Sequence, residues 1–348
     1  MFSIFDPTNR KNRRDFLKIG ALGLGGLTLP DLLKARAASS THDRSVIFLF
    51  LHGGPSQFET FDPKMSAPAG NRSATGEIKT ALPGVTFGST FEKLAARAKD
   101  LAVVRSYRPG DAGHNIKPIV HAETGNANMG ALYARLAGAN HPVSGMPRNV
   151  MLFPRAVDAK TQEGNLRFGN FLSSGTLGAN YSPFSPTKGG ALQENMRLKI
   201  AKDQLENRRQ LLASLDGIKS RLDTTGEMDA LDRFQQQAFD VILRGAADAF
   251  DLAKEDPKVV DRYDTSKLAR PDNISKKWNN YKNYCDNGAT LGKLLLLARR
   301  LCEAGCGFIT VTTNFVWDMH ADNNNAGVAE GMGYMGSPLD HALGAFLD

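Results

Sequence analysis

Four short, mainly apolar stretches of the chain are typical of strands buried on both faces of a parallel sheet. They span residues 45–51, 101–106, 149–153 and 307–313. Because parallel strands need crossover connections, we expect helices in the segments between them. The pattern therefore predicts an α/β fold with a mostly parallel sheet.

Helical periodicity fills much of the chain between these stretches. Residues 90–99 and 291–304 predict helices, and Gly305 is placed to cap the end of the second one. Residues from about 193 to 264 alternate charged and apolar positions at helical spacing, which indicates a helical insertion. A last amphipathic helix is predicted over 338–348, where Leu339, Leu343 and Leu347 lie four residues apart.

The position of this last helix raises a question about the C-terminus. In an alternating α/β fold, a helix at 338–348 should lead into another strand. We therefore expect the sequence to be truncated at its C-terminal end. A natural C-terminal helix is the alternative that the pattern leaves open.

Composition excludes several classes of protein. The 348 residues are 41% hydrophobic and 23% charged, which argues against a disordered chain or a polytopic membrane protein. Three cysteines are too few for a disulfide scaffold. The net charge of +7 is concentrated at the start, where residues 1–37 hold seven Lys or Arg against three Asp. The remainder carries too little surplus charge to predict nucleic-acid binding.

The first 37 residues have the organisation of an export signal. The pair Arg13-Arg14 precedes Phe16-Leu17-Lys18, an apolar stretch over 19–33 and the small-residue motif Ala35-Arg36-Ala37. The paired arginines predict transport by the twin-arginine export machinery to the periplasm or the extracellular space. The apolar stretch is too short for a good membrane span, so we expect no stable transmembrane anchor after cleavage. The alternative is a basic amphipathic helix on a cytosolic protein.

Polar clusters follow three of the predicted strands, at 52–62, 105–121 and 314–322. Because the carboxyl ends of parallel strands meet at one edge of a sheet, these clusters are expected to converge in one pocket. Asp318 and His320 are two residues apart and can point the same way in extended chain. A carboxylate with an imidazole suits zinc, manganese or iron, and calcium less well. We predict these two residues as ligands of a divalent metal; a hydrogen-bonded loop pair without metal is the alternative.

The other two clusters supply the remaining candidates. His114 and His121 are predicted as catalytic acid–base groups or as further metal ligands, with purely structural histidines as the alternative. Main-chain amides at Gly53 and Gly54 can form a nest for an anion, although a tight turn explains the same glycines. Ser56 and Arg105 complete the candidate anion site.

The three cysteines have competing interpretations. Cys302 and Cys306 are four residues apart and could form a redox pair or ligate metal, but small buried side chains are the preferred explanation for Cys302. Export to an oxidising compartment would allow one disulfide and leave one cysteine, such as Cys285, free.

Beyond these local patterns, the chain resembles the domain-of-unknown-function family 1501, a family of bacterial twin-arginine-exported proteins. The resemblance is carried by Arg13-Arg14-x-Phe-Leu-Lys, by Gly-Gly-Pro-Ser-Gln-Phe-Glu-Thr-Phe-Asp-Pro-Lys at 53–64, by the segment 247–256 with Arg262-Tyr263, and by 298–305 leading to Trp317-Asp318-x-His320. It implies a doubly wound, alkaline phosphatase-like sheet with a helical insertion. The parts would be a signal peptide (1–37), the first part of the core (38–190), the insertion (191–285) and the core continuation (286–348). The family usually extends through a further strand, which supports the truncation.

The resemblance also implies a function. Enzymes of the alkaline phosphatase/sulfatase-like superfamily use metals to hydrolyse phosphate or sulfate esters. This chain departs from them, because His52 stands where those enzymes usually carry a metal-binding Asp, and no sulfatase nucleophile motif precedes Thr124-Gly125. The sequence therefore predicts an exported metal-dependent ester hydrolase with an atypical nucleophile site, with zinc, manganese or calcium as the metal. The alternative is a noncatalytic exported binding or assembly protein that retains the fold.

Overall fold

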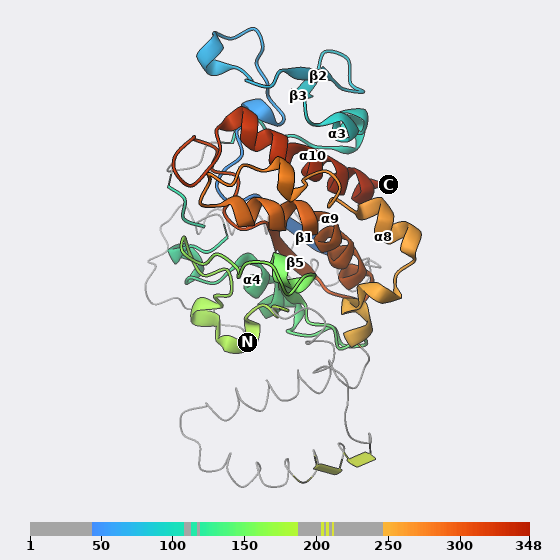
Figure 1. The fold of residues 1–348 in the computed structure, drawn as a ribbon. Coiled ribbons are helices and arrows are strands. Elements are labelled where there is room, and N and C mark those ends of the chain that lie inside the picture. Colours follow the sequence, from blue (N-terminus) through green and yellow to red (C-terminus); the bar gives the residue numbers. More distant parts are fainter. Residues whose placement is uncertain are drawn as a thin grey trace, which may run out of the picture. The chain divides into compact units, whose positions relative to one another are not determined.

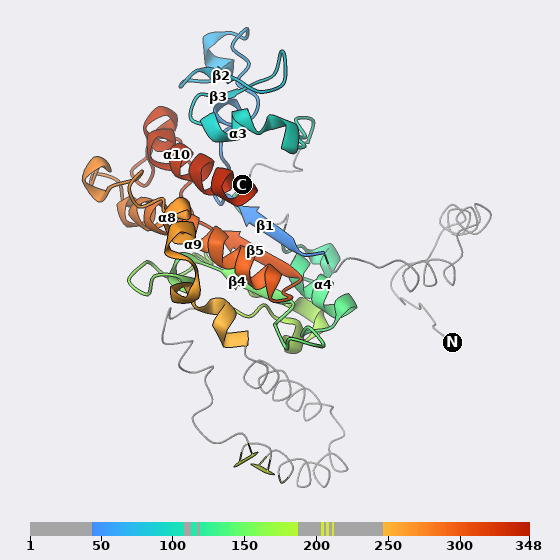
Figure 2. The ribbon, with the colours of Figure 1, turned by 90° about the vertical axis from the view of Figure 1, so that its right-hand side faces the viewer.

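A three-stranded parallel sheet forms part of the structural unit Ser45–Asp348. The computed structural model describes residues 44–107, 113–116, 119–186, 203–204, 207–208, 211 and 246–348. The strands β1 (Val46–Phe50), β5 (Phe308–Thr312) and β4 (Asn149–Leu152) are arranged in the order β1-β5-β4, all parallel (Figures 1 and 2). The α/β class and the strands predicted at 45–51, 149–153 and 307–313 are thereby confirmed.

The strand predicted at 101–106 is wrong. This segment has no strand partner, and the Val104 side chain is 74% exposed. Its apolar run is short, and only Leu101 packs against the core. Arg105 instead contacts Asp62 across 3.6 Å and donates to the Thr86 carbonyl at 3.4 Å. Thr86 belongs to a small antiparallel pair of strands, β2 (Glu77–Lys79) and β3 (Thr86–Gly88).

Successive side chains of β1 point to opposite faces of the sheet, and each face packs against a core, so the strand is apolar throughout. Ile47 and Leu49 pack against the core that contains the long helices, whereas Phe48 and Phe50 pack against a second core on the other face. The second core contains Met151 and Phe171. Both faces of the sheet are therefore buried, as continuous apolar strands predict. The helix α4 (Met129–Ala137) contacts β4 and β5.

Two long helices pack against each other and contribute to the first core. They are α9 (Tyr281–Glu303) and α10 (Val328–Leu347) (Figure 2). Leucines of α9 and methionines of α10 are buried in the same core as Trp317. Gly305 ends α9 as predicted: its φ is +99°, and the Cys306 N–H donates to the Leu301 carbonyl at 2.8 Å, in a Schellman motif. The last helix is longer than predicted, because it begins at Val328 and contains Pro338 in its interior.

Shorter elements complete the described chain. The helix predicted at 90–99 is α3 (Glu92–Ala96) followed by a 3₁₀ turn, and α8 (Pro257–Tyr263) lies in the predicted insertion. The continuous helix α9 crosses the predicted boundary at residue 285, while most of residues 191–245 and the predicted signal at 1–37 lie outside the described residues. Among the described residues, no helix is both long and apolar enough to cross a membrane. Short 3₁₀ helices occupy Gln57–Glu59, Ala69–Asn71, Ala98–Asp100, Ala122–Thr124, Pro154–Ala156, Gly175–Leu177, Ala179–Tyr181, Ala246–Phe250, Leu252–Lys254 and Pro271–Asn273.

Candidate metal centre

The chain leaving β1 packs directly on the chain that follows β5. The Trp317 N–H donates to the His52 carbonyl at 3.1 Å. The next residue, Gly53, has a φ of +114°, and a Cβ atom placed on it would lie only 2.4 Å from the Asp318 nitrogen. Glycine is therefore required here, because a side chain would push the two segments apart. The adjacent Gly54 is exposed, and a Cβ atom there would meet no other atom within 4 Å.

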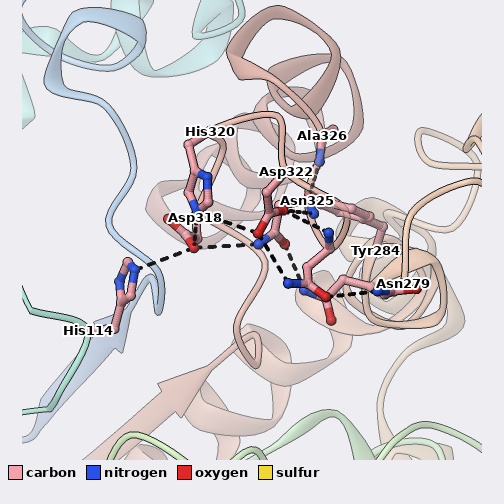
Figure 3. A network of polar contacts seen from close by, with 10 residues as sticks. His114, Asn279, Tyr284, Asp318, His320, Asp322, Asn325 and Ala326 are labelled. Carbon is pink, nitrogen blue, oxygen red and sulfur yellow. Dashed lines mark hydrogen bonds and ion pairs between the residues drawn. The ribbon is translucent and has the colours of Figure 1, made fainter.

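This packing brings Asp318 into a cluster with two histidines (Figure 3). Asp318 Oδ2 lies 2.8 Å from His320 Nε2 and 3.5 Å from His114 Nε2. One ligand atom from each residue lies within 4.8 Å of the other two. In a tetrahedral zinc site with bonds of about 2.0–2.1 Å, neighbouring ligand atoms are about 3.3 Å apart. The three groups are thus close to the spacing that a shared metal ion requires.

The donor chemistry of this His/Asp triad also fits a metal. Two imidazole nitrogens and one carboxylate oxygen form the ligand set of many catalytic zinc sites, which keep a fourth position open. Manganese and iron accept the same donors, whereas calcium prefers oxygen ligands alone. Of the metals predicted from the sequence, zinc and manganese therefore fit better than calcium.

His114 is held in place by aromatic side chains. Its ring lies edge-on to Phe315 and Phe168, with centroid distances of 5.0 and 5.5 Å, and those two rings stack on each other at 4.4 Å. Two residues further on, the buried Ile116 donates its N–H to the Phe168 carbonyl at 3.1 Å. Both the ring and the main chain of the His114 segment are therefore fixed against the segment that carries Phe168.

Asp318 and His320 are held by the loop that leads into α10. Asp318 is largely buried and contacts Asn325, whose side chain is 1% exposed. Asp322 lies 3.9 Å from His320 Nε2. Burial opposes ionisation of Asp322, but hydrogen bonds from the main chain of Asn325 and Asn324 outweigh it and keep its pKa below the usual value. A second negative charge therefore faces the histidine side of the triad.

A pocket of about 330 Å³ opens over the triad. Its lining includes all three triad residues together with Asn165, Arg167 and Asp322. The exposed guanidinium of Arg167 forms no ion pair with any described residue, so its charge is available to an anion in the pocket. Asn314 fixes this side of the pocket, because its side-chain oxygen accepts the Asn165 N–H at 3.0 Å.

Sequence reasoning missed Arg167, Phe168 and Asn325. Arg167 and Phe168 lie in an irregular segment more than forty residues from His114, and no strand end or motif marks them. The run of three asparagines at 323–325 was the one available signal for Asn325, since it directly follows Asp322.

His52 lies near the triad but does not belong to it. It is 1% exposed and surrounded by aromatic rings, including Phe50, Phe171 and Phe315. Neither ring nitrogen makes a well-formed hydrogen bond with a described residue. Burial lowers the pKa of His52 to about 4, and a weak main-chain contact with His114 only partly opposes this effect. At neutral pH the imidazole is therefore uncharged.

Other predicted site residues lie away from the triad. His121 caps a 3₁₀ helix, where its Nδ1 accepts the Glu123 N–H at 3.1 Å. The main-chain carbonyl of Ser56 accepts hydrogen bonds within the turn at 56–60, and Arg105 is held by Asp62. None of these three lines the triad pocket. The structure thus brings together His114, Asp318 and His320, with Gly53 packed behind them.

The three cysteines are all unpaired and lie outside this pocket. Cys306 is buried, whereas Cys302 is partly buried and packs against the same core, and burial raises the pKa of both thiols.

Fold and site together define an α/β protein with a candidate His/Asp metal centre at the carboxyl ends of its parallel strands. Residues 43–348 match the family described as protein of unknown function DUF1501, so the chain belongs to that family. No curated protein and no solved structure shows a significant match to the chain.

Proposed function

We propose that this protein is an exported, metal-dependent hydrolase of phosphate or sulfate esters. The observation that carries the proposal is the His114–Asp318–His320 triad at the base of a pocket that also presents Arg167. A metal ion and an arginine without a carboxylate partner in the same pocket suit a phosphate or sulfate ester, because the acid that hydrolysis releases is an oxyanion.

The arrangement of the sheet supports the same assignment. Asp318 and His320 follow the carboxyl end of β5, and the chain that leaves the carboxyl end of β1 packs against Asp318. Open α/β sheets bind ligands at such strand ends. We take the three described strands as part of a doubly wound, alkaline phosphatase-like sheet, in keeping with the resemblance to that superfamily. Residues 1–37 would direct the folded protein through the twin-arginine machinery to the periplasm or the extracellular space.

Each residue of the pocket has a defined part in the proposed reaction. His114, Asp318 and His320 would hold the metal, which when bound activates water and polarises the ester oxygen. Arg167 binds the non-bridging oxygens of the substrate and orients it. Asp322, kept ionised and 3.9 Å from His320 Nε2, would add negative charge beside the metal. No Ser, Thr or Cys is among the described residues that line the pocket, and in this sense the nucleophile site is atypical.

The test is hydrolysis of a panel of phosphate and sulfate esters by the full chain supplied with Zn²⁺ or Mn²⁺. We expect Asp318→Asn to abolish turnover, because it removes the anionic metal ligand. Arg167→Lys should raise KM by about 10-fold or more, since a charged hydrogen bond contributes about 1.5–3 kcal/mol. The matched control is Arg105→Lys. Arg105 pairs with Asp62 outside the pocket, so this substitution should leave the kinetics unchanged.

Two results would contradict the proposal. One is full activity in Asp318→Asn. The other is a metal-loaded wild-type protein that hydrolyses none of the esters; a partner-binding protein that retains the metal centre would then become the better account.

A further inference from the structure

The loop that follows the triad is fastened to the beginning of α9. We refer to residues 322–326 as the asparagine loop (Figure 3). Its main chain accepts hydrogen bonds from the two residues that precede α9, and it donates one to a tyrosine in the first turn of that helix. The bonds are Asn279 N–H to the Asn323 carbonyl at 3.2 Å, Asn280 N–H to the Asn324 carbonyl at 3.1 Å, and Ala326 N–H to Tyr284 Oη at 3.1 Å.

Two side chains of the asparagine loop approach the triad: Asp322 lies near His320, and Asn325 lies near Asp318. Asn325 is 1% exposed, and its Nδ2 lies 3.5 Å from Asp318 Oδ2. Its Oδ1 accepts a hydrogen bond from Asn280 Nδ2 at 2.7 Å. An ionised Asp318 only accepts hydrogen bonds, so the nitrogen of Asn325 faces it, and the amide oxygen is left to accept from Asn280. Asn280, which immediately precedes α9, thus holds the Asn325 amide in the orientation that Asp318 requires.

The contact with Asn325 acts on the oxygen that both histidines approach. Asp318 Oδ2 is the atom that lies 2.8 Å from His320 Nε2 and 3.5 Å from His114 Nε2. An N–H group directed at the same oxygen restricts rotation of the carboxylate and holds Oδ2 toward the histidines. Hydrogen-bond partners of this kind, one step behind the ligands, typically contribute about 10- to 100-fold to metal affinity.

We infer that Asn325 is a positioning residue of the metal centre, oriented through Asn280 by the beginning of α9. The inference rests on the proposed function, since it requires that the His114–Asp318–His320 triad binds a metal ion. Asn325 itself does not coordinate the metal; it fixes the carboxylate that does.

The experiment is a titration of the metal-free full chain with Co²⁺, followed by the visible absorption spectrum of the bound ion, and with Zn²⁺ in competition. Asn325→Leu preserves much of the side-chain shape but removes the donor, so we expect affinity to fall by about 10- to 100-fold and the Co²⁺ spectrum to change. Asn280→Ala keeps Asn325 but frees its amide, and should give a smaller loss in the same direction. It also serves as the test if Asn325→Leu does not fold.

The matched control is Asn279→Leu. This change breaks the exposed Asn279–Asn324 side-chain bond of the same loop without touching Asp318. It should leave the affinity and the spectrum unchanged. Equal losses in Asn279→Leu and Asn325→Leu, or wild-type binding in Asn325→Leu, would overturn the positioning role alone. A wild-type protein that binds neither ion would overturn the metal centre, and the positioning role with it.

Discussion

At the level of single residues, the packing of Gly53 against the Trp317–Asp318 peptide sets how closely the chain leaving β1 approaches Asp318. Gly53 and Gly54 both have positive φ angles, but only a Cβ atom at residue 53 would collide with neighbouring main chain. Alanine at either position would strain the backbone, but only alanine at residue 53 would also displace Asp318. Comparing the two substitutions therefore distinguishes backbone strain from steric displacement.

We expect Gly54→Ala to lower the free energy of unfolding by about 1–2 kcal/mol through strain alone. Gly53→Ala adds the collision and should cost about 2–4 kcal/mol. Gly53→Ala should also weaken metal binding, while Gly54→Ala should not. Urea unfolding and Co²⁺ titration of the two variants measure both effects. Equal behaviour of the two variants would show that Gly53 does not position Asp318.

His52 provides a pH-dependent test at the same scale. Its pKa is about 4 in the folded protein and close to 6.5 in an unfolded chain. Below pH 6.5 the unfolded chain therefore binds a proton that the folded protein excludes. The stability that follows from this difference is complete above pH 6.5 and is lost as the pH falls toward 4, by about 3 kcal/mol in all.

The variant His52→Phe retains an aromatic ring in this apolar environment and removes the titration. Between pH 7 and pH 4, metal-free His52→Phe should lose about 3 kcal/mol less unfolding free energy than the wild type. Urea unfolding at both pH values, in the presence of a chelator, makes the comparison. Parallel pH profiles for the two proteins would mean that His52 is not buried in its neutral form.

The sequence predicted part of this site for a physical reason. Parallel strands end on one edge of a sheet, so Asp318 and His320 could be expected there from their position after the predicted strand that forms β5. His114 was expected to join them from a strand at 101–106 that does not form, and it reaches the pocket because its segment packs against Phe168. His121 and Arg105 came from the same reasoning but lie elsewhere, because residues 101–106 do not join the sheet. Arg167 enters the pocket through an irregular loop, and local patterns carry no information about such tertiary contacts.

At the level of elements, the chain was most predictable where burial is continuous. The strands β1, β4 and β5 and the apolar part of α9 are all recognisable from their hydrophobic runs. The first half of α10 was missed because its glycines and Pro338 are poor helix formers. Tertiary contacts override that propensity: Met332, Met335 and Leu339 of α10 are buried in the same core as Leu291 and Leu295 of α9.

Asp340 joins two of these elements and offers a test of their packing. Its carboxylate on α10 accepts the Lys93 and Leu94 N–H groups at the start of α3, at 2.9 and 2.8 Å, and so caps that helix from another element. Burial raises its pKa. Asp340→Ala should lower the free energy of unfolding by about 1–2 kcal/mol, and Asp340→Asn, which still accepts a hydrogen bond, by less.

Urea unfolding measures these changes. Asp100→Ala, which removes an exposed ion pair with Arg97, should stay within about 0.5 kcal/mol of the wild type. A loss for Asp340→Ala no larger than that of this control would contradict the capping role.

At the level of the whole molecule, the candidate metal pocket is formed by chain segments that are far apart in sequence. The segments around residues 114 and 167, the chain that follows β5 and the residue that precedes α9 all line one pocket, and Gly53 packs against the main chain of Asp318. The central claim is that this pocket is built to hold a metal ion.

Elemental analysis of the purified full chain after exhaustive dialysis tests that claim most directly. We predict about one zinc, manganese or iron ion per wild-type chain, as expected for one three-ligand site. Asp318→Asn, folded to the same extent by circular dichroism, should retain almost none. A wild-type chain without bound metal even after Zn²⁺ and Mn²⁺ are supplied, or an Asp318→Asn variant with the same metal content as the wild type, would contradict the account.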